Sequence, residues 1–142
     1  MRINIIGDSI TARSTRDMLW KSGFALVSSD ADNPDYQIWV DEDPSATYIV
    51  IDGIQSSRKG LEEYVSDMIS ELTDTRIVLA RAGGIRNERH LRVIATGSPA
   101  DQRAVECGIL RGVHFAIRGR GPEDLGRSRS LESKKKRWWW PL

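Results

Sequence analysis

The sequence has a single cysteine, Cys107, and no apolar run that approaches the roughly 20 residues a membrane-spanning helix needs. One cysteine excludes an internal disulfide and a cysteine-based zinc site, so Cys107 is expected to be a small core residue on a helix. The N-terminus also lacks a basic region followed by an apolar stretch and a cleavage site, and no signal peptide is predicted. These absences favour a cytoplasmic protein, or one that joins a membrane or an assembly by other means.

The size and composition fit one folded domain with a separate, charged end. The chain has 142 residues, of which 39% are hydrophobic and 29% are charged. Residues 1–116 contain 13 Lys or Arg and 17 Asp or Glu, whereas residues 117–142 contain 8 and 3. The sequence therefore predicts an α/β domain over residues 1–118, followed by a basic linker and tail over residues 119–142.

Hydrophobic spacing predicts strands that alternate with helices. Strands are expected at residues 2–6, 24–29, 47–51, 76–80 and 113–117, with an irregular edge strand at 36–40. Helices are expected at 9–21, 61–72 and 98–112, the last with Ser98 as its N-cap. This order predicts a three-layer α/β/α sandwich around a mainly parallel, five-stranded sheet. Residues 7–9, 52–55 and 82–90 would then share the rim at the carboxyl ends of the strands.

The stretch Gly7-Asp8-Ser9-Ile10-Thr11 places a serine between a predicted strand and a predicted helix, where free backbone N–H groups can stabilise an oxyanion. It resembles the nucleophile block, G-D-S-I-T, of the SGNH or GDSL hydrolases, a family of esterases and lipases. The resemblance implies an SGNH or flavodoxin-like sandwich in which Ser9 attacks an acyl carbon. The family's G-x-N-D block would fall on residues 53–56, where Gln55 replaces the oxyanion-hole asparagine.

Two departures from the family bear on catalysis. Residues 24–47 contain no glycine for the second block, and residues 118–142 contain no histidine for the D-x-x-H pair. His90, in the predicted loop or short helix after strand 76–80, is expected first to be a solvent-exposed histidine, and it is the substitute base if Ser9 is catalytic. His114 is expected to be packed within the last strand. The leading hypothesis is a non-catalytic SGNH-derived interaction or assembly module, and the alternative is a serine ester hydrolase that uses Ser9, Gln55 and His90.

A second, weaker resemblance is to response-regulator receiver domains, which have acidic residues after their first and third strands. Asp8 and Asp52 occupy those places, but an arginine, Arg118, stands where the receiver has its lysine. The chain has no glycine-rich phosphate-binding motif, and the acidic run at 41–43 is expected to be a solvated loop. The sequence therefore predicts no cofactor and no metal site.

Near its C-terminus the sequence has four consecutive cations and then three tryptophans, namely Lys134, Lys135, Lys136, Arg137, Trp138, Trp139 and Trp140. Three adjacent indoles point in different directions in any regular structure, so they cannot all enter one small core. A surface that combines cations with aromatic rings suits a groove with an acidic rim on a protein partner. Residues 127–142 are therefore predicted to dock on a protein, with an anionic membrane surface and then nucleic acid as the alternatives.

Overall fold

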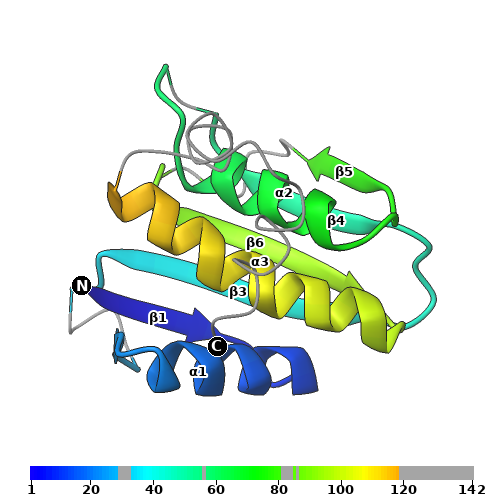
Figure 1. Cartoon of the computed structure of the whole chain (residues 1–142), viewed down its shortest axis with the longest axis horizontal. Coiled ribbons are helices and arrows are strands. Elements are labelled where there is room, and N and C mark those ends of the chain that lie inside the picture. Colours follow the sequence, from blue (N-terminus) through cyan, green and yellow to red (C-terminus); the bar gives the residue numbers. More distant parts are fainter. Residues whose placement is uncertain (29–32, 56, 81–84, 86, 119–142) are drawn as a thin grey trace, which may run out of the picture.

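A computed structural model describes residues 1–28, 33–55, 57–80, 85 and 87–118. Within these residues the chain forms a six-stranded sheet and three helices (Figure 1). In chain order the elements are β1 (Arg2–Ile6), α1 (Ile10–Lys21), β2 (Ala25–Leu26), β3 (Tyr36–Asp43), β4 (Ile49–Gly53), α2 (Leu61–Leu72), β5 (Ile77–Ala80), β6 (His90–Thr96) and α3 (Pro99–Arg118). The predicted α/β class and the mainly parallel sheet are confirmed.

The sheet has the strand order β2-β1-β3-β6-β4-β5, and one of its ladders is antiparallel. β1, β2, β3 and β6 run in one direction, whereas β4 and β5 run in the other, because β4 pairs with β6 antiparallel. The predicted edge strand at 36–40 is instead the interior strand β3, which pairs with β1 and β6. The predicted single rim is therefore wrong, since the carboxyl ends of β1 and β4 lie at opposite ends of the sheet.

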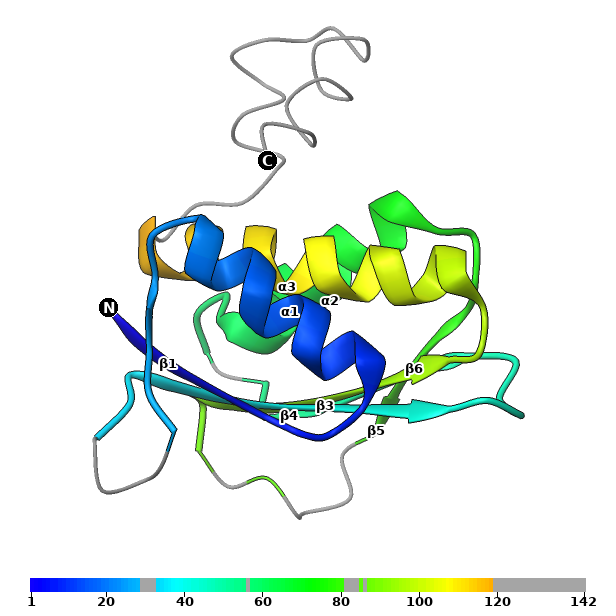
Figure 2. The same cartoon turned by 90° about the horizontal axis from the view of Figure 1, so that it is seen from below.

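All three helices of the described chain lie on one face of the sheet (Figure 2). Right-handed crossovers that run in opposite directions and step toward opposite edges place their helices on the same face. The connections β1–α1–β2 and β4–α2–β5 have this relation. The prediction of a three-layer sandwich is therefore wrong, and the described residues form two layers.

α3 is the central helix of that layer, and two of its glycines allow it to approach α2 closely. A Cβ atom added to Gly108 would lie 2.3 Å from Ile69 Cγ1, and one added to Gly112 would lie 2.7 Å from Val65 Cα. The side chains of Val65 and Ile69 are fully buried in the main core, as are those of Ile109 and Val113. Gly112 is thus a contact residue inside α3 and does not end the helix.

Near the C-terminal end of the described chain, one predicted strand is wrong and one observed strand was not predicted. Residues 113–117 continue α3 to Arg118, so the predicted final strand does not form. The strand that completes the sheet is β6, which was not predicted; its first residue, His90, was expected in a loop or short helix. Leu91, Val93 and Ala95 are fully buried beneath the helices, which is the alternation of a strand with one covered face.

A buried carboxylate joins the end of β6 to the start of α3. Asp101 is 5% exposed and accepts hydroxyl hydrogen bonds from Thr73 at 2.7 Å, Thr75 at 2.7 Å and Thr96 at 2.6 Å. Burial raises the pKa of the Asp101 carboxyl, but the three hydroxyl donors together hold that pKa below its usual value. The Ser98 hydroxyl accepts from the Asp101 backbone N–H at 3.4 Å, as the predicted N-cap should.

No helix of the described chain is long and apolar enough to cross a membrane. The predicted partner-binding residues, Lys134, Lys135, Lys136, Arg137, Trp138, Trp139 and Trp140, lie outside the described residues.

Candidate functional site

The turn between β1 and α1 requires a glycine at position 7. Gly7 has a φ of +143°, and a Cβ atom there would lie 2.3 Å from the carbonyl oxygen of Val40 in β3. Any larger residue would therefore meet both backbone strain and a collision with the neighbouring strand. The end of β1 and the middle of β3 are held together closely at this turn.

Ser9 is the N-cap of α1, in the strand-to-helix position that the sequence predicts. Its φ of −67° and ψ of 162° are extended, and its Oγ accepts a hydrogen bond from the Ala12 backbone N–H at 3.0 Å. The same hydroxyl donates to the Val40 carbonyl oxygen at 3.3 Å. The hydroxyl hydrogen and one lone pair of Ser9 are thus already used within the fold.

A carboxylate from β3 lies at the start of α1. Glu42 Oε1 accepts from the Thr11 backbone N–H at 2.8 Å and from the Thr11 hydroxyl at 2.5 Å. The first turn of a helix has unpaired N–H groups and a partial positive charge, so an anion is stabilised there. In the SGNH interpretation this region would stabilise an oxyanion beside Ser9, but Glu42 already provides a negative charge.

Arg16 stabilises the same turn from α1. Its Nη1 donates to the carbonyl oxygens of Ile5 and Gly7, each at 3.0 Å. Ile5 lies in β1 and Gly7 follows the strand directly, whereas Arg16 lies six residues after Ile10, the first residue of α1. The turn is therefore a closed structural unit in which Ser9, Glu42 and Arg16 satisfy backbone groups.

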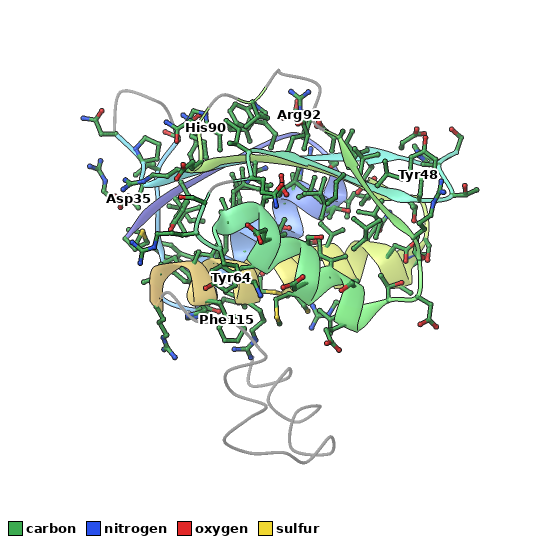
Figure 3. The ribbon with its side chains drawn as sticks, turned by 90° about the horizontal axis from the view of Figure 1, so that it is seen from above. Asp35, Tyr48, Tyr64, His90, Arg92 and Phe115 are labelled. Carbon is green, nitrogen blue, oxygen red and sulfur yellow. The ribbon has the colours of Figure 1, made fainter. Side chains whose placement is uncertain are left out.

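His90, the predicted base, does not lie beside Ser9. It is the first residue of β6 and is level with Gln37 of β3, whereas the Ser9 hydroxyl reaches Val40, three residues further along. Three residues of strand correspond to about 10 Å. The His90 ring also lies on the face of the sheet away from the helices, where it meets the Trp39 ring edge-on at 5.6 Å (Figure 3).

Gln55, the predicted oxyanion donor, is still further from Ser9. It is exposed and follows β4, whose last residue, Gly53, pairs with Leu91 near the start of β6. Because β4 runs antiparallel to β6, its carboxyl end lies near the amino ends of β3 and β6. The structure therefore does not bring Ser9, Gln55 and His90 together.

The receiver-like interpretation needs two acidic residues at one rim, and the same reversal separates them. Asp8 is exposed at the end of β1, whereas Asp52 is 8% exposed, lies in β4 and pairs in register with Arg92 and Ala80. Among the described residues, no group of three or more His, Cys, Asp or Glu is placed to hold a metal ion.

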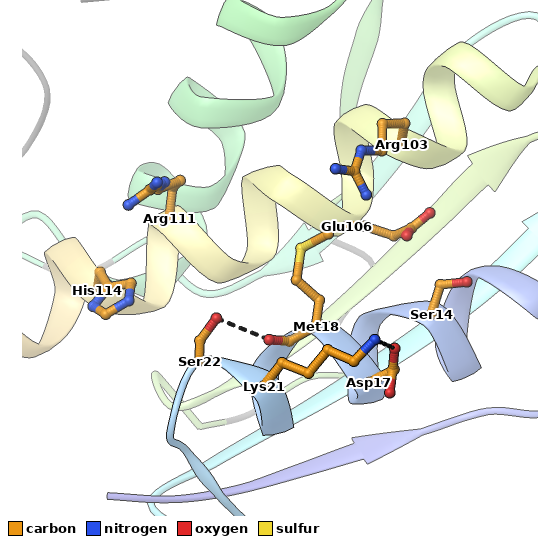
Figure 4. A pocket seen from close by; sticks show the side chains of 9 residues that line it. All are labelled: Ser14, Asp17, Met18, Lys21, Ser22, Arg103, Glu106, Arg111 and His114. Carbon is orange, nitrogen blue, oxygen red and sulfur yellow. Dashed lines mark hydrogen bonds and ion pairs between the residues drawn. The ribbon is translucent and has the colours of Figure 1, made fainter. Parts of the chain in front are cut away.

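A groove of about 670 Å³ runs between α1 and α3, away from every predicted catalytic residue (Figure 4). Its polar lining includes Asp17, Lys21, Arg103, Glu106, Arg111 and His114. Burial lowers the pKa of His114, and the cations Arg111 and Arg118 lower it further. Burial raises the pKa of Glu106, an effect that Arg103 opposes and Glu42 adds to. The lining mixes both signs of charge, so it selects no single class of ligand.

Sequence reasoning missed the roles of Glu42 and Arg16 at the turn. The prediction placed the acidic run at 41–43 in a solvated loop, but all three residues belong to β3. An acidic residue at the end of a strand that lies beside the start of a helix indicates a helix-stabilising role, because a carboxylate stabilises the first turn of a helix. That signal requires β3 to be recognised as the strand next to β1, which the acidic, proline-containing surroundings obscure.

No protein-family model matches the chain, and no curated protein sequence matches it either. Among solved structures, the chain is similar to the catalytic domain of CwlV, an N-acetylmuramoyl-L-alanine amidase from Bacillus (Paenibacillus) polymyxa var. colistinus. The TM-score is 0.60 at 9% sequence identity, and the match covers 84% of this chain and 100% of that one. A likeness at this identity shows the α/β fold alone.

Proposed function

We propose that this chain is a non-catalytic interaction or assembly module that docks on a protein partner through its basic, tryptophan-rich end. The proposal that the chain is non-catalytic rests on one observation: at the start of α1 the polar groups that catalysis would need already form hydrogen bonds within the fold. Ser9 Oγ bonds Ala12 and Val40, and Glu42 bonds Thr11 where an oxyanion would need a donor. A nucleophilic serine needs a free hydroxyl and a base within hydrogen-bond reach.

The docking part of the proposal rests on the sequence of residues 127–142. Four cations resist burial while three indoles favour it, so an interface with an acidic rim satisfies both. Burial of each ring contributes on the order of 1–3 kcal/mol, whereas exposed charges are screened at physiological salt. The proposal therefore makes Trp138, Trp139 and Trp140 the main anchors.

The proposed lack of catalysis is tested with a fluorophosphonate probe, which labels activated serines. We expect the full chain to remain unlabelled at concentrations that label a known serine esterase completely. Labelling of the full chain that Ser9→Ala abolishes would overturn this part and make a serine ester hydrolase the better interpretation.

The docking part is tested with two triple variants of the full chain. Replacement of Trp138, Trp139 and Trp140 by Ala should weaken partner capture more than replacement of Lys134, Lys135 and Lys136 by Gln. Vesicles that contain anionic lipid form a parallel arm, because sedimentation with them would assign the tail to a membrane surface. If the tryptophan variant binds both protein and vesicles as the unaltered chain does, the docking proposal is wrong.

A further inference from the structure

The two edges of the sheet differ in how they are protected. At one edge β2 has only two residues, and beyond it Arg16 takes the carbonyl oxygen of Ile5 in β1. At the other edge β5 has four residues, Ile77-Val78-Leu79-Ala80, and within the described chain it pairs with β4 alone. One edge is thus short and closed by a charged side chain, and the other is longer and uncharged.

Within the part of the chain that the structure describes, β5 carries no charged residue, proline, bulge or covering element, although it is a short strand of four residues. Native edge strands are protected by charged residues, proline, bulges or a covering element. β5, at the edge of the sheet in Figure 1, has no charged residue and no proline and keeps regular register with β4. Its Leu79 is 45% exposed. Tyr48 directly precedes β4, lies beside Arg76 just before β5, and is 36% exposed. Among the described residues no element pairs with this outer side of β5, so it can serve as a template for another strand.

We propose that β5 pairs antiparallel with β5 of a second copy of this chain, which makes a two-fold dimer with one continuous sheet. A second copy is the proposed occupant because each of the two copies then contributes the same uncharged β5 edge to the pairing. Pairing of β5 with the β2 edge of another copy would build an open filament, but the short β2 and Arg16 oppose it. Self-pairing therefore closes at two copies.

Charge and side-chain direction are compatible with this pairing. Arg76 precedes β5 and lies over the Tyr48 ring at 5.3 Å, so an antiparallel pair places the two Arg76 cations at opposite ends. Leu79 pairs in register with Ile51, which is fully buried beneath the helices. A two-fold axis perpendicular to the sheet keeps both helix layers on one side, so Leu79 of each copy covers the other.

The expected dimer is weak. Stable protein interfaces bury about 1,600 Å² in total, and two four-residue strands with one exposed leucine each supply much less. We therefore expect half-dimerisation at micromolar or higher protein concentration. Sedimentation velocity of the full chain from about 5 to about 500 µM should show a monomer that converts to a dimer and to no larger species.

Charge substitution at Leu79 tests the pairing directly. The proposed pairing is centred on Leu79, with Leu79 of one copy opposite Leu79 of the other at the two-fold axis, so Leu79→Lys and Leu79→Glu should each abolish the dimer by like-charge repulsion. An equal mixture of the two variants should restore a dimer, because the opposite charges then meet. Trp20→Lys, at a 66% exposed position on α1, is the matched control and should dimerise normally. Rescue in the mixture also excludes simple misfolding of the variants.

A variant of the C-terminal tail separates a dimer formed by β5 from one formed by the tail. The chain with Trp138, Trp139 and Trp140 replaced by Ala should still dimerise if β5 is the interface. The dimer should also persist at about 0.5 M salt, since paired apolar strands are not screened. A dimer that the tail variant or salt abolishes, or that both Leu79 variants retain, would overturn the β5 pairing without affecting the docking proposal. A chain that stays monomeric throughout the range would also overturn it.

Discussion

Glu42 of β3 and Thr11 of α1 form a two-point contact, in which one carboxylate oxygen accepts both the backbone N–H and the hydroxyl hydrogen of Thr11. Thr11 is fully buried, so water cannot replace Glu42 without a change in packing. The contact joins β3, an interior strand of the sheet, to α1, the helix that follows β1. It makes the start of α1 dependent on a residue 31 positions away in the sequence.

Replacement of Glu42 by Gln should lower the free energy of unfolding by about 1–2 kcal/mol at pH 7. The amide keeps the shape of the carboxylate but loses the charge that favours the positive end of α1. Asp41→Asn removes the same charge from an exposed neighbour whose ion pair with Arg92 is 3.8 Å long, so it should change stability by less than about 0.5 kcal/mol. Urea unfolding of both variants measures the difference, and equal effects would show that Glu42 does not stabilise the helix start.

Gly112→Ala should destabilise the protein by about 1–3 kcal/mol, although alanine is the better helix former. The added Cβ would lie 2.7 Å from Val65 Cα and 2.8 Å from Val65 N, so backbone atoms of α2 must move. Gly108→Ala should cost less, because its Cβ would lie 3.1 Å or more from the backbone of Ile69 and under 3.0 Å only from the movable Ile69 side chain. Ser70→Ala on the exposed surface of α2 is the control with no overlap. Thermal unfolding gives the order, and a stabilised Gly112→Ala variant would contradict the close α2–α3 contact.

Asp101→Asn should destabilise the protein by about 1–3 kcal/mol at neutral pH, because three hydroxyl donors lose a charged acceptor. The pKa of Asp101 is lower in the folded than in the unfolded chain, where it is about 3.8. Its contribution is therefore complete above the unfolded pKa and is lost as the pH falls through the folded pKa.

The difference in unfolding free energy between Asp101→Asn and the unaltered chain should consequently shrink below about pH 4. Urea unfolding between pH 3 and pH 7 measures this, with the exposed Asp74→Asn as the control for general charge effects. A difference that is constant over this range would show that the carboxylate charge adds nothing to the network.

His114 should titrate below its ordinary value of 6.5, because burial, Arg111 and Arg118 all disfavour its protonated form. Arg118→Gln should raise the pKa of His114 by removing one of these cations. Arg103→Gln is the control, since Arg103 lines the same groove and is not among the groups that shift His114. Proton NMR of the two histidines, with His90→Gln to assign the signals, measures both effects. A pKa above 6.5 would contradict the buried, cationic surroundings.

Local patterns were enough to predict the start of α1 and all of α2. Ser98 was expected as an N-cap and Ser9 as the residue that opens the first helix, and the apolar positions of α2 from Leu61 to Leu72 match its predicted bounds. These features depend on neighbours within a few residues. For that reason spacing and cap chemistry identified them without knowledge of the sheet.

The rest of the candidate site depended on strand order and direction, which no local pattern specifies. His90 and Gln55 were placed beside Ser9 on the assumption that every strand is parallel, and the antiparallel β4–β6 ladder removes that assumption. Gly112 was interpreted as a helix end because glycine disfavours helices, whereas its contact with Val65 explains its presence. Tertiary packing outweighed local propensity at that position.

The place of β6 in the sheet bears on how the protein acquires its structure during synthesis. In the described chain β3 and β4 share no ladder, and β6 joins them although it is the last strand to leave the ribosome. Without β6, the ladders of the folded sheet reduce to two separate groups, β2-β1-β3 and β4-β5, in which β3 and β4 each lack a neighbour. Such strands are exposed to wrong partners until β6 inserts between them. The sheet cannot be completed before β6 is available, so a chain shortened before His90 should not fold.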